Sequence, residues 1–146
     1  MTKYAIDTNV YVDAFRNPSV AEELKAFLTQ HLSITYVSAV VIQELRAGAW
    51  SEEQVEALEK GLVAPSEKRR RVFTPSANAF KVSGRILSEL AAKGDLDLAR
   101  AKGSFVNDTL LAASCLEHGM TLITGNSDFS RIKGRLKTFR YVAPWP

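Results

Sequence analysis

The chain has 146 residues, of which 46% are hydrophobic and 24% are charged, and its formal net charge is +3. These values are typical of a single globular domain, 1–146, and they exclude a disordered or fibrous protein. The longest apolar run, Val37 to Ile42, is too short to span a bilayer, no signal-peptide pattern precedes the first strand, and the one cysteine, Cys115, cannot form an internal disulfide, so we expect a cytoplasmic protein without membrane segments.

The first half of the chain predicts strands that alternate with helices. In order, they are a strand at Tyr4–Ile6, a helical turn at Val10–Phe15, an amphipathic helix at Val20–Thr29, a strand at Ser33–Val37, a helix from Ala39 to about Gly48 capped by Ser38, and a helix at Glu52–Leu62. Pro65 and Ser66 indicate a loop, which leads into a basic run from Lys68 to Arg71.

The second half continues the alternation. It predicts a short strand at Val72–Phe73, a long helix at Ser76–Ala92, a short helix that reaches about Lys102, an apolar helix from its cap Ser104 to Leu116, a strand at Met120–Thr124 and a last strand at Phe139–Val142. We therefore expect an α/β fold, in which a mostly parallel sheet is covered by helices on both faces.

Four acids each follow an apolar strand or lie in an apolar helix. They are Asp7, Glu44, Asp108 and Asp128. Glu44 projects from a largely apolar face, and Asp108 shares a face with Leu111 and Cys115. Because strand ends and helix starts meet at one edge of a parallel sheet, we expect these carboxylates to cluster there. Such a cluster repels itself unless it binds a hard cation such as Mg²⁺ or Mn²⁺, and phosphodiester hydrolysis is the chemistry that this arrangement favours.

Three of these acids also have a simpler explanation. Asp7 can cap a helix or begin a turn, and Asp108 gains from the dipole of its own helix. Asp128 can cap the turn that leads to Phe129. A phosphatase of the haloacid-dehalogenase type also begins with a strand that ends in Asp, but it needs a second Asp where Asn9 stands.

Four segments together resemble the PIN-domain nucleases, and more narrowly the VapC-type toxins of toxin–antitoxin pairs. These segments are Ile6–Asn9, Ser38–Leu45, Asn107–Ala113 and Leu122–Phe129, and the resemblance covers essentially the whole chain. It implies a three-layer α/β/α sandwich with a central, mostly parallel sheet, and an endoribonuclease site that depends on Mg²⁺ or Mn²⁺. It also implies a homodimer and a small cognate antitoxin whose tail occupies the acidic groove.

The resemblance also assigns roles to residues. Asp7, Glu44 and Asp108 become metal ligands, with a fourth carboxylate from the last segment, which we assign to Asp128. Related sequences often carry this acid where Asn126 stands here, so the fourth ligand is the least secure assignment. The expected supporting residues are Thr8, Asn9 and Asn126, and the expected RNA contacts are Arg69, Arg70, Arg71, Arg131 and Lys133. Basic runs of this kind are also common on ordinary protein surfaces.

Two other functions share this fold. A PIN nuclease that processes RNA or acts on DNA would have the same site, and a neighbouring antitoxin gene would distinguish the toxin from it. A non-catalytic PIN-like scaffold is disfavoured because such a protein is expected to lose the acids, and they are present here.

Overall fold

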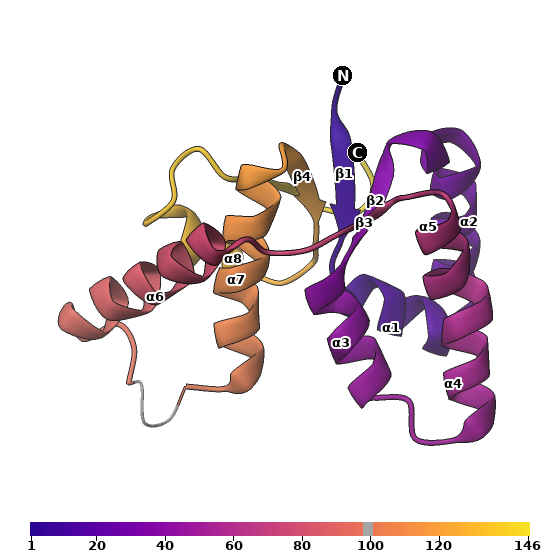
Figure 1. Ribbon diagram of the computed structural model, residues 1–146, viewed down its shortest axis with the longest axis horizontal. Helices are drawn as coiled ribbons and strands as arrows, with labels where there is room; N and C mark the ends of the chain where they lie inside the picture. The colour runs from indigo at the N-terminus through magenta and orange to yellow at the C-terminus, as the bar shows by residue number, and fades with distance from the viewer. Residues whose placement is uncertain (98–100) are drawn as a thin grey trace.

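The centre of the computed structural model, which describes residues 1–97 and 101–146, is a sheet in which all neighbouring strands are parallel (Figure 1). The described strands are β1 (Lys3–Ile6), β2 (Thr35–Ser38), β3 (Val72–Phe73), β4 (Met120–Ile123) and β5 (Arg140–Val142), in the spatial order β3-β2-β1-β4-β5. The predicted α/β fold with a parallel sheet is therefore confirmed.

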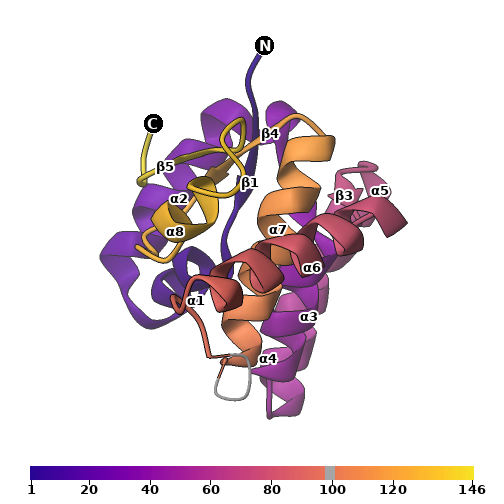
Figure 2. The ribbon, with the colours of Figure 1, turned by 90° about the vertical axis from the view of Figure 1, so that its left-hand side faces the viewer.

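Helices cover both faces of this sheet. The first set is α1 (Thr8–Arg16), α2 (Pro18–His31), α3 (Ala39–Ala47), α4 (Glu52–Leu58) and α5 (Ala64–Lys68), and the second is α6 (Ala77–Ala92), α7 (Gly103–Glu117) and α8 (Phe129–Lys133). Figure 1 shows α1 to α5 on one side of the strands and α6 to α8 on the other, and Figure 2 views the molecule from this second side. The right-handed crossover rule explains the separation, because the chain reverses its direction across the sheet between β3 and β4.

Strand β1 lies in the middle of the sheet and carries its core. Ala5 pairs with Tyr36 of β2 on one side and with Leu122 of β4 on the other. Ala5, Ile6 and Leu122 are buried almost completely, as expected for a strand that is covered on both faces. The residue that follows β1 is therefore delivered to the carboxyl edge at the centre of the molecule.

Two helices begin directly where strands end, because polar residues cap them. Asp7 accepts a hydrogen bond from the backbone N–H of Thr8, and Ser38 accepts one from that of Val40. Helix α1 consequently spans Thr8–Arg16 and starts earlier than the helical turn predicted at Val10–Phe15.

The predicted loop at Pro65 and Ser66 is wrong. Helix α4 passes into a π-helical segment, Glu59–Val63, and then into α5, so the chain stays helical to Lys68. Pro65 is tolerated because it lies in the first turn of α5, where the missing N–H of proline costs little.

The beginning of α7 also differs from the prediction. The helix starts at Gly103, with Lys102 at the cap position and no capping hydrogen bond from a side chain, so Ser104 is not the cap. The short helix predicted to reach Lys102 includes residues 98–100, which lie outside the described residues. No helix within the described ranges is long and apolar enough to cross a membrane.

Candidate functional site

Three of the predicted acids meet in one open pocket of about 380 Å³ at the carboxyl edge of the sheet. Asp7 follows β1, Glu44 comes from α3 and Asp108 comes from α7. The other lining residues are Thr8, Asn9, Val12, Asp13, Arg16, Ser104 and Asn126. The convergence of three carboxylates from separate elements agrees with the expected cluster, although Asp128 is not among the lining residues.

Both carboxylate oxygens of Asp7 are held by hydrogen bonds. Oδ1 accepts the N–H of Thr8 at 2.8 Å, and Oδ2 accepts the hydroxyl of Thr124 at 2.7 Å. Asp7 is only 3% exposed, and burial raises its pKa while the two hydrogen bonds oppose the rise. The helix cap and the site residue proposed from the sequence are thus one and the same carboxylate.

Thr124 is a part of the site that sequence reasoning missed. It follows β4, which is paired with β1, so its hydroxyl reaches Asp7 across the two strands. The sequence did contain a signal, because this hydroxyl residue ends a strand that is predicted to lie at the acidic edge of the sheet. Threonine is so common in strands that its position alone did not indicate a role.

Glu44 is half-buried and is tied to the start of α1. Its Oε1 accepts a hydrogen bond from the hydroxyl of Thr8 at 2.8 Å, so Thr8 links α1 to α3. The neighbouring Asn9 has a buried side-chain oxygen, Oδ1, for which the described residues provide no hydrogen-bond partner. A buried oxygen without a donor is a group that a cation or a bound water would satisfy.

Asp108 shows the electrostatic cost of the cluster. It is 6% exposed, and its Oδ2 accepts a hydrogen bond from the amide of Asn126 at 3.1 Å. Burial and the negative charges of Asp7, Glu44 and Asp128 raise the pKa of Asp108 to about 8. The pocket therefore holds more negative charge than its own donors neutralise.

Asn126 lies nearer to the acidic pocket than Asp128 does. Besides its contact with Asp108, the Asn126 side chain accepts the N–H of Asp128 at 2.9 Å. The half-buried Asp128 precedes α8 without capping it through its side chain, and its Oδ1 lies 4.0 Å from Nη1 of Arg131. The simple explanation of Asp128 as a helix cap is therefore not supported by its contacts.

We expect Asp128→Asn to weaken Mn²⁺ binding roughly tenfold, because it removes one charge that acts on the cluster. Asn126→Ala should have a smaller effect, since a neutral amide contributes position but no charge. Calorimetric titration with Mn²⁺ measures both, and Glu53→Gln, an exposed acid on α4, is the control. The assignment of Asp128 fails if Asp128→Asn binds Mn²⁺ like the parent while Asn126→Ala loses affinity.

The predicted RNA contacts lie in two different places. Arg69, Arg70 and Arg71 follow α5 and precede β3, so they lie toward the amino ends of the strands, whereas the acids follow the carboxyl ends. The guanidinium of Arg71 is 5.0 Å from the centre of the Tyr36 ring. This run does not line the acidic pocket, and its contact with RNA stays a prediction.

The other two basic residues come from α8. Arg131 lies 4.8 Å above the ring of Phe105 and borders Asp128, so it is close to the acidic cluster. The ammonium of Lys133 donates to the backbone oxygens of Lys137 and Phe139 and thereby ties down the turn before β5. Arg131 is therefore the better placed of the two for contact with a substrate.

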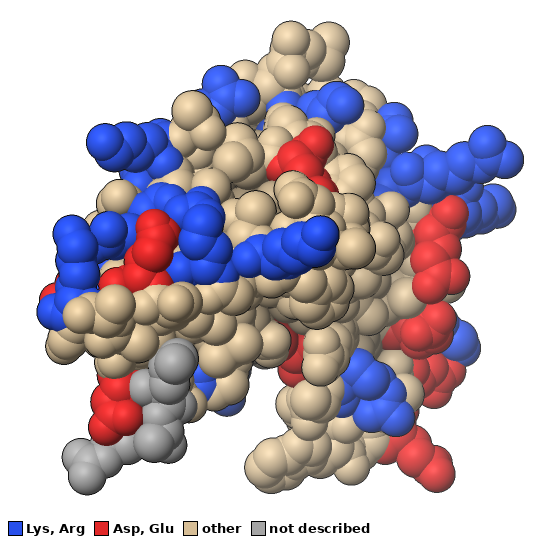
Figure 3. All heavy atoms as spheres, turned by 60° about the vertical axis from the view of Figure 1, so that its left-hand side comes forward, with Lys and Arg blue, Asp and Glu red and all other residues tan. Residues whose placement is uncertain are grey.

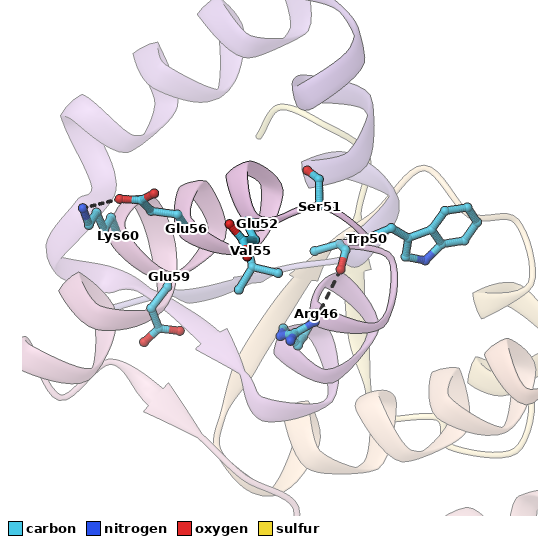
Figure 4. A pocket seen from close by; sticks show the side chains of 9 residues that line it. Arg46, Trp50, Ser51, Glu52, Val55, Glu56, Glu59 and Lys60 are labelled. Atoms are coloured by element: carbon cyan, nitrogen blue, oxygen red, sulfur yellow. Dashed lines mark hydrogen bonds and ion pairs between the residues drawn. The ribbon is translucent and has the colours of Figure 1, made fainter.

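A larger hollow of about 550 Å³ lies between α3 and α4, but its residues do not form a reactive cluster (Figure 4). Its acids, Glu52, Glu56 and Glu59, are exposed, and Glu56 is paired with Lys60. Figure 4 shows the indole of Trp50 directed away from the other side chains, and this residue is 89% exposed. The acidic pocket remains the candidate site.

The oxygen ligands that the acidic pocket offers fit a hard divalent cation. Carboxylates, an amide and the unpartnered oxygen of Asn9 are all oxygen ligands, and a cation would offset the charge that raises the pKa of Asp108. In the described part of the chain, no group of three or more acidic, histidine or cysteine side chains is arranged so that it could hold a metal ion without rearrangement. Each of the three carboxylates instead accepts a hydrogen bond from a threonine or asparagine side chain, and its remaining lone pairs stay available to a cation.

Comparison with known proteins identifies the fold. The family model of the PIN domain matches residues 4–135, and no curated protein matches the chain. Among solved structures, the DNA-bound VapBC of Salmonella typhimurium is 24% identical with a TM-score of 0.71 over 98% of both chains. FitAcB of Neisseria gonorrhoeae is 20% identical with a TM-score of 0.69, over 97% of this chain and 98% of the other. VapBC2 of Rickettsia felis, bound to a promoter DNA fragment, is 23% identical with a TM-score of 0.67, over 99% and 100%.

Proposed function

Because the chain belongs to the PIN-domain family, we propose that it is a metal-dependent endoribonuclease and the toxin of a VapBC-type toxin–antitoxin system. The PIN family supports hydrolysis of nucleic acids. The observation that carries the proposal is the convergence of Asp7, Glu44 and Asp108 in one pocket whose charge is not neutralised. A crowded cluster of carboxylates is costly in a folded protein, and binding of Mg²⁺ or Mn²⁺ gives it a purpose.

Asp7, Glu44 and Asp108 would hold the cation, joined by Asp128 directly or through a water. A divalent cation held by these residues would supply an activated water for attack on the scissile phosphate and would offset the negative charge of the transition state. Arg16 lines the same pocket, so its guanidinium can hold a phosphate oxygen of the strand being cut.

The remaining polar residues keep the carboxylates in position. Asp7 is held by Thr124, Glu44 by Thr8 and Asp108 by Asn126. Fixed carboxylates bind a cation more tightly than mobile ones, because less conformational freedom is lost on binding. These three donors are therefore positioning residues of the proposed site.

The proposed partners follow from the structural neighbours. The structures of VapBC from Salmonella typhimurium and of a toxin–antitoxin complex from Klebsiella pneumoniae support a small cognate antitoxin for this chain as well. We propose that the tail of this antitoxin enters the acidic pocket, that the toxin is a homodimer, and that it acts on RNA in the cytoplasm.

Purified protein freed of antitoxin should cleave single-stranded RNA when Mg²⁺ or Mn²⁺ is present, and excess EDTA should abolish cleavage because the carboxylates alone cannot activate water. Sequencing of the RNA ends measures where cutting occurs, and DNA of the same sequence is the control substrate. Restoration of cleavage by excess Mn²⁺ excludes damage by the chelator. Cleavage that persists unchanged in EDTA would contradict the metal mechanism.

A further inference from the structure

Another pocket, of about 500 Å³, lies between the end of α6 and α8, and we refer to it as the basic pocket. Its charged lining residues are Lys93, Asp95, Arg131 and Arg135, so three cations face one acid. Figure 3 shows Lys and Arg side chains gathered on this side of the molecule, over α6 and α8. A hollow with an excess of positive charge favours an anionic ligand.

The cations of this pocket are only partly neutralised by the protein. Among the described residues, no acidic side chain lies within 4.0 Å of the charged groups of Lys93 or Arg135. The nearby Glu89 is occupied by an ion pair of 2.8 Å with Arg85. Two charges therefore remain available to a ligand.

The pocket is also built in a fixed shape on two sides. The guanidinium of Arg131 packs 4.8 Å from the centre of the Phe105 ring and donates to the backbone oxygen of Asp95. Arg85 donates to the backbone oxygen of Arg135 at 3.4 Å, which links α6 to the segment after α8. The backbone on both sides is thus held in place while the Lys93 and Arg135 side chains stay free.

A continuous series of contacts joins this pocket to the acidic one. Asp108 is bonded to Asn126 at 3.1 Å, Asn126 is bonded to Asp128 at 2.9 Å, and Asp128 lies 4.0 Å from Arg131. Arg131 lines the basic pocket. A nucleic-acid strand that extends from the acidic pocket toward Arg131 would therefore reach the basic pocket.

We propose that the basic pocket between α6 and α8 binds a backbone phosphate of the RNA strand at a position away from the scissile phosphate. The inference rests on the proposed function, and it adds Lys93 and Arg135 to Arg131 as residues that hold the substrate. Arginine and lysine contacts to phosphate fix the register of a strand without reading its sequence. The pocket therefore controls how tightly RNA binds and leaves the choice of cleavage site to other contacts.

The test replaces both free cations, in Lys93→Gln/Arg135→Gln. The KM for a long single-stranded RNA should rise roughly tenfold. The negative slope of log affinity against log salt should become smaller in magnitude by about 1.4, which is two contacts of about 0.7 each. At saturating RNA, kcat should change less than about twofold, because no reacting group is touched. The matched control is Lys25→Gln/Lys81→Gln, which removes the same charge from exposed positions on α2 and α6 outside this pocket.

Several outcomes decide the inference. It is supported if the loss is larger for a long RNA than for one of a few nucleotides, and if Lys93→Gln alone, at an exposed position, gives part of the effect. It is overturned if the double variant keeps the salt slope of the control, or if only the complex with a protein partner is weakened. A parent protein that neither binds nor cleaves RNA overturns the proposed function itself, and this inference with it.

Discussion

Replacement of Asp7 or Asp108 by asparagine is expected to lower RNA cleavage at least about a hundredfold, because each change removes a charge that would hold the cation. At position 7 the asparagine oxygen can accept the N–H of Thr8 while its NH₂ donates to the hydroxyl of Thr124, and at position 108 its oxygen can accept the amide of Asn126, so the fold should survive. Cleavage under single-turnover conditions and calorimetric Mn²⁺ titration should show that the cleavage rate and the affinity for Mn²⁺ are lost together.

Glu22→Gln is the control for this experiment, because Glu22 is an exposed acid on α2 outside the acidic pocket. Its cleavage rate should equal that of the parent. Thermal unfolding of each variant in EDTA shows whether the chain still folds. Asp7→Asn or Asp108→Asn variants that retain most of the activity would remove these acids from the proposed mechanism and leave them as structural groups.

The metal-free protein should lose stability as the pH rises from about 4 to about 8, and Asp108→Asn should lose much less. The pKa of Asp108 is raised from 3.8 to about 8 in the folded state, so between these values the folded chain binds more protons than the unfolded chain. The stabilisation is complete below the unfolded pKa and disappears as the pH passes the folded pKa. At pH 8, the free energy of unfolding of Asp108→Asn should exceed that of the parent by at least about 1.4 kcal/mol, which is the equivalent of one pKa unit.

Urea unfolding in EDTA at a series of pH values measures this difference. Only the difference between variant and parent matters, since groups outside the acidic cluster titrate equally in both. Excess Mn²⁺ should reverse the order, because a ligand that binds only the folded parent stabilises it by mass action. A difference in free energy of unfolding between variant and parent that stays constant over this range would show that the charge of Asp108 costs nothing.

The sequence was sufficient to predict the strands and the meeting of three acids at one edge of the sheet. Asp7 ends an apolar strand, and Glu44 and Asp108 interrupt apolar helices. Each acid breaks a hydrophobic pattern, so the sequence alone reveals it. Thr124 was not visible, because threonine fits a strand and its role depends on the register between β1 and β4. Its partner is far away in the sequence.

Two other differences arose from local shape. The sequence favours Asp128 as the fourth ligand because Mg²⁺ sites rely on carboxylates, whereas in the structure the loop after β4 brings the amide of Asn126 to Asp108; the role of Asp128 as a ligand stays a prediction. Pro65 indicated a break, yet the π-helical segment Glu59–Val63 delivers it to the first turn of α5, where proline is acceptable. Backbone geometry of this kind depends on tertiary packing and has no reliable pattern in one sequence.

The bond between Thr124 and Asp7 has a consequence for when the site exists during synthesis. The two residues are 117 positions apart, and the N–H of Asp7 also bonds to the backbone oxygen of Ile123. A ribosome-bound chain that has not yet released β4 therefore lacks a partner for one oxygen of Asp7 and lacks Asn126 beside Asp108. The pocket is completed only when the chain has emerged beyond Asn126, so the proposed nuclease would gain its site late in synthesis.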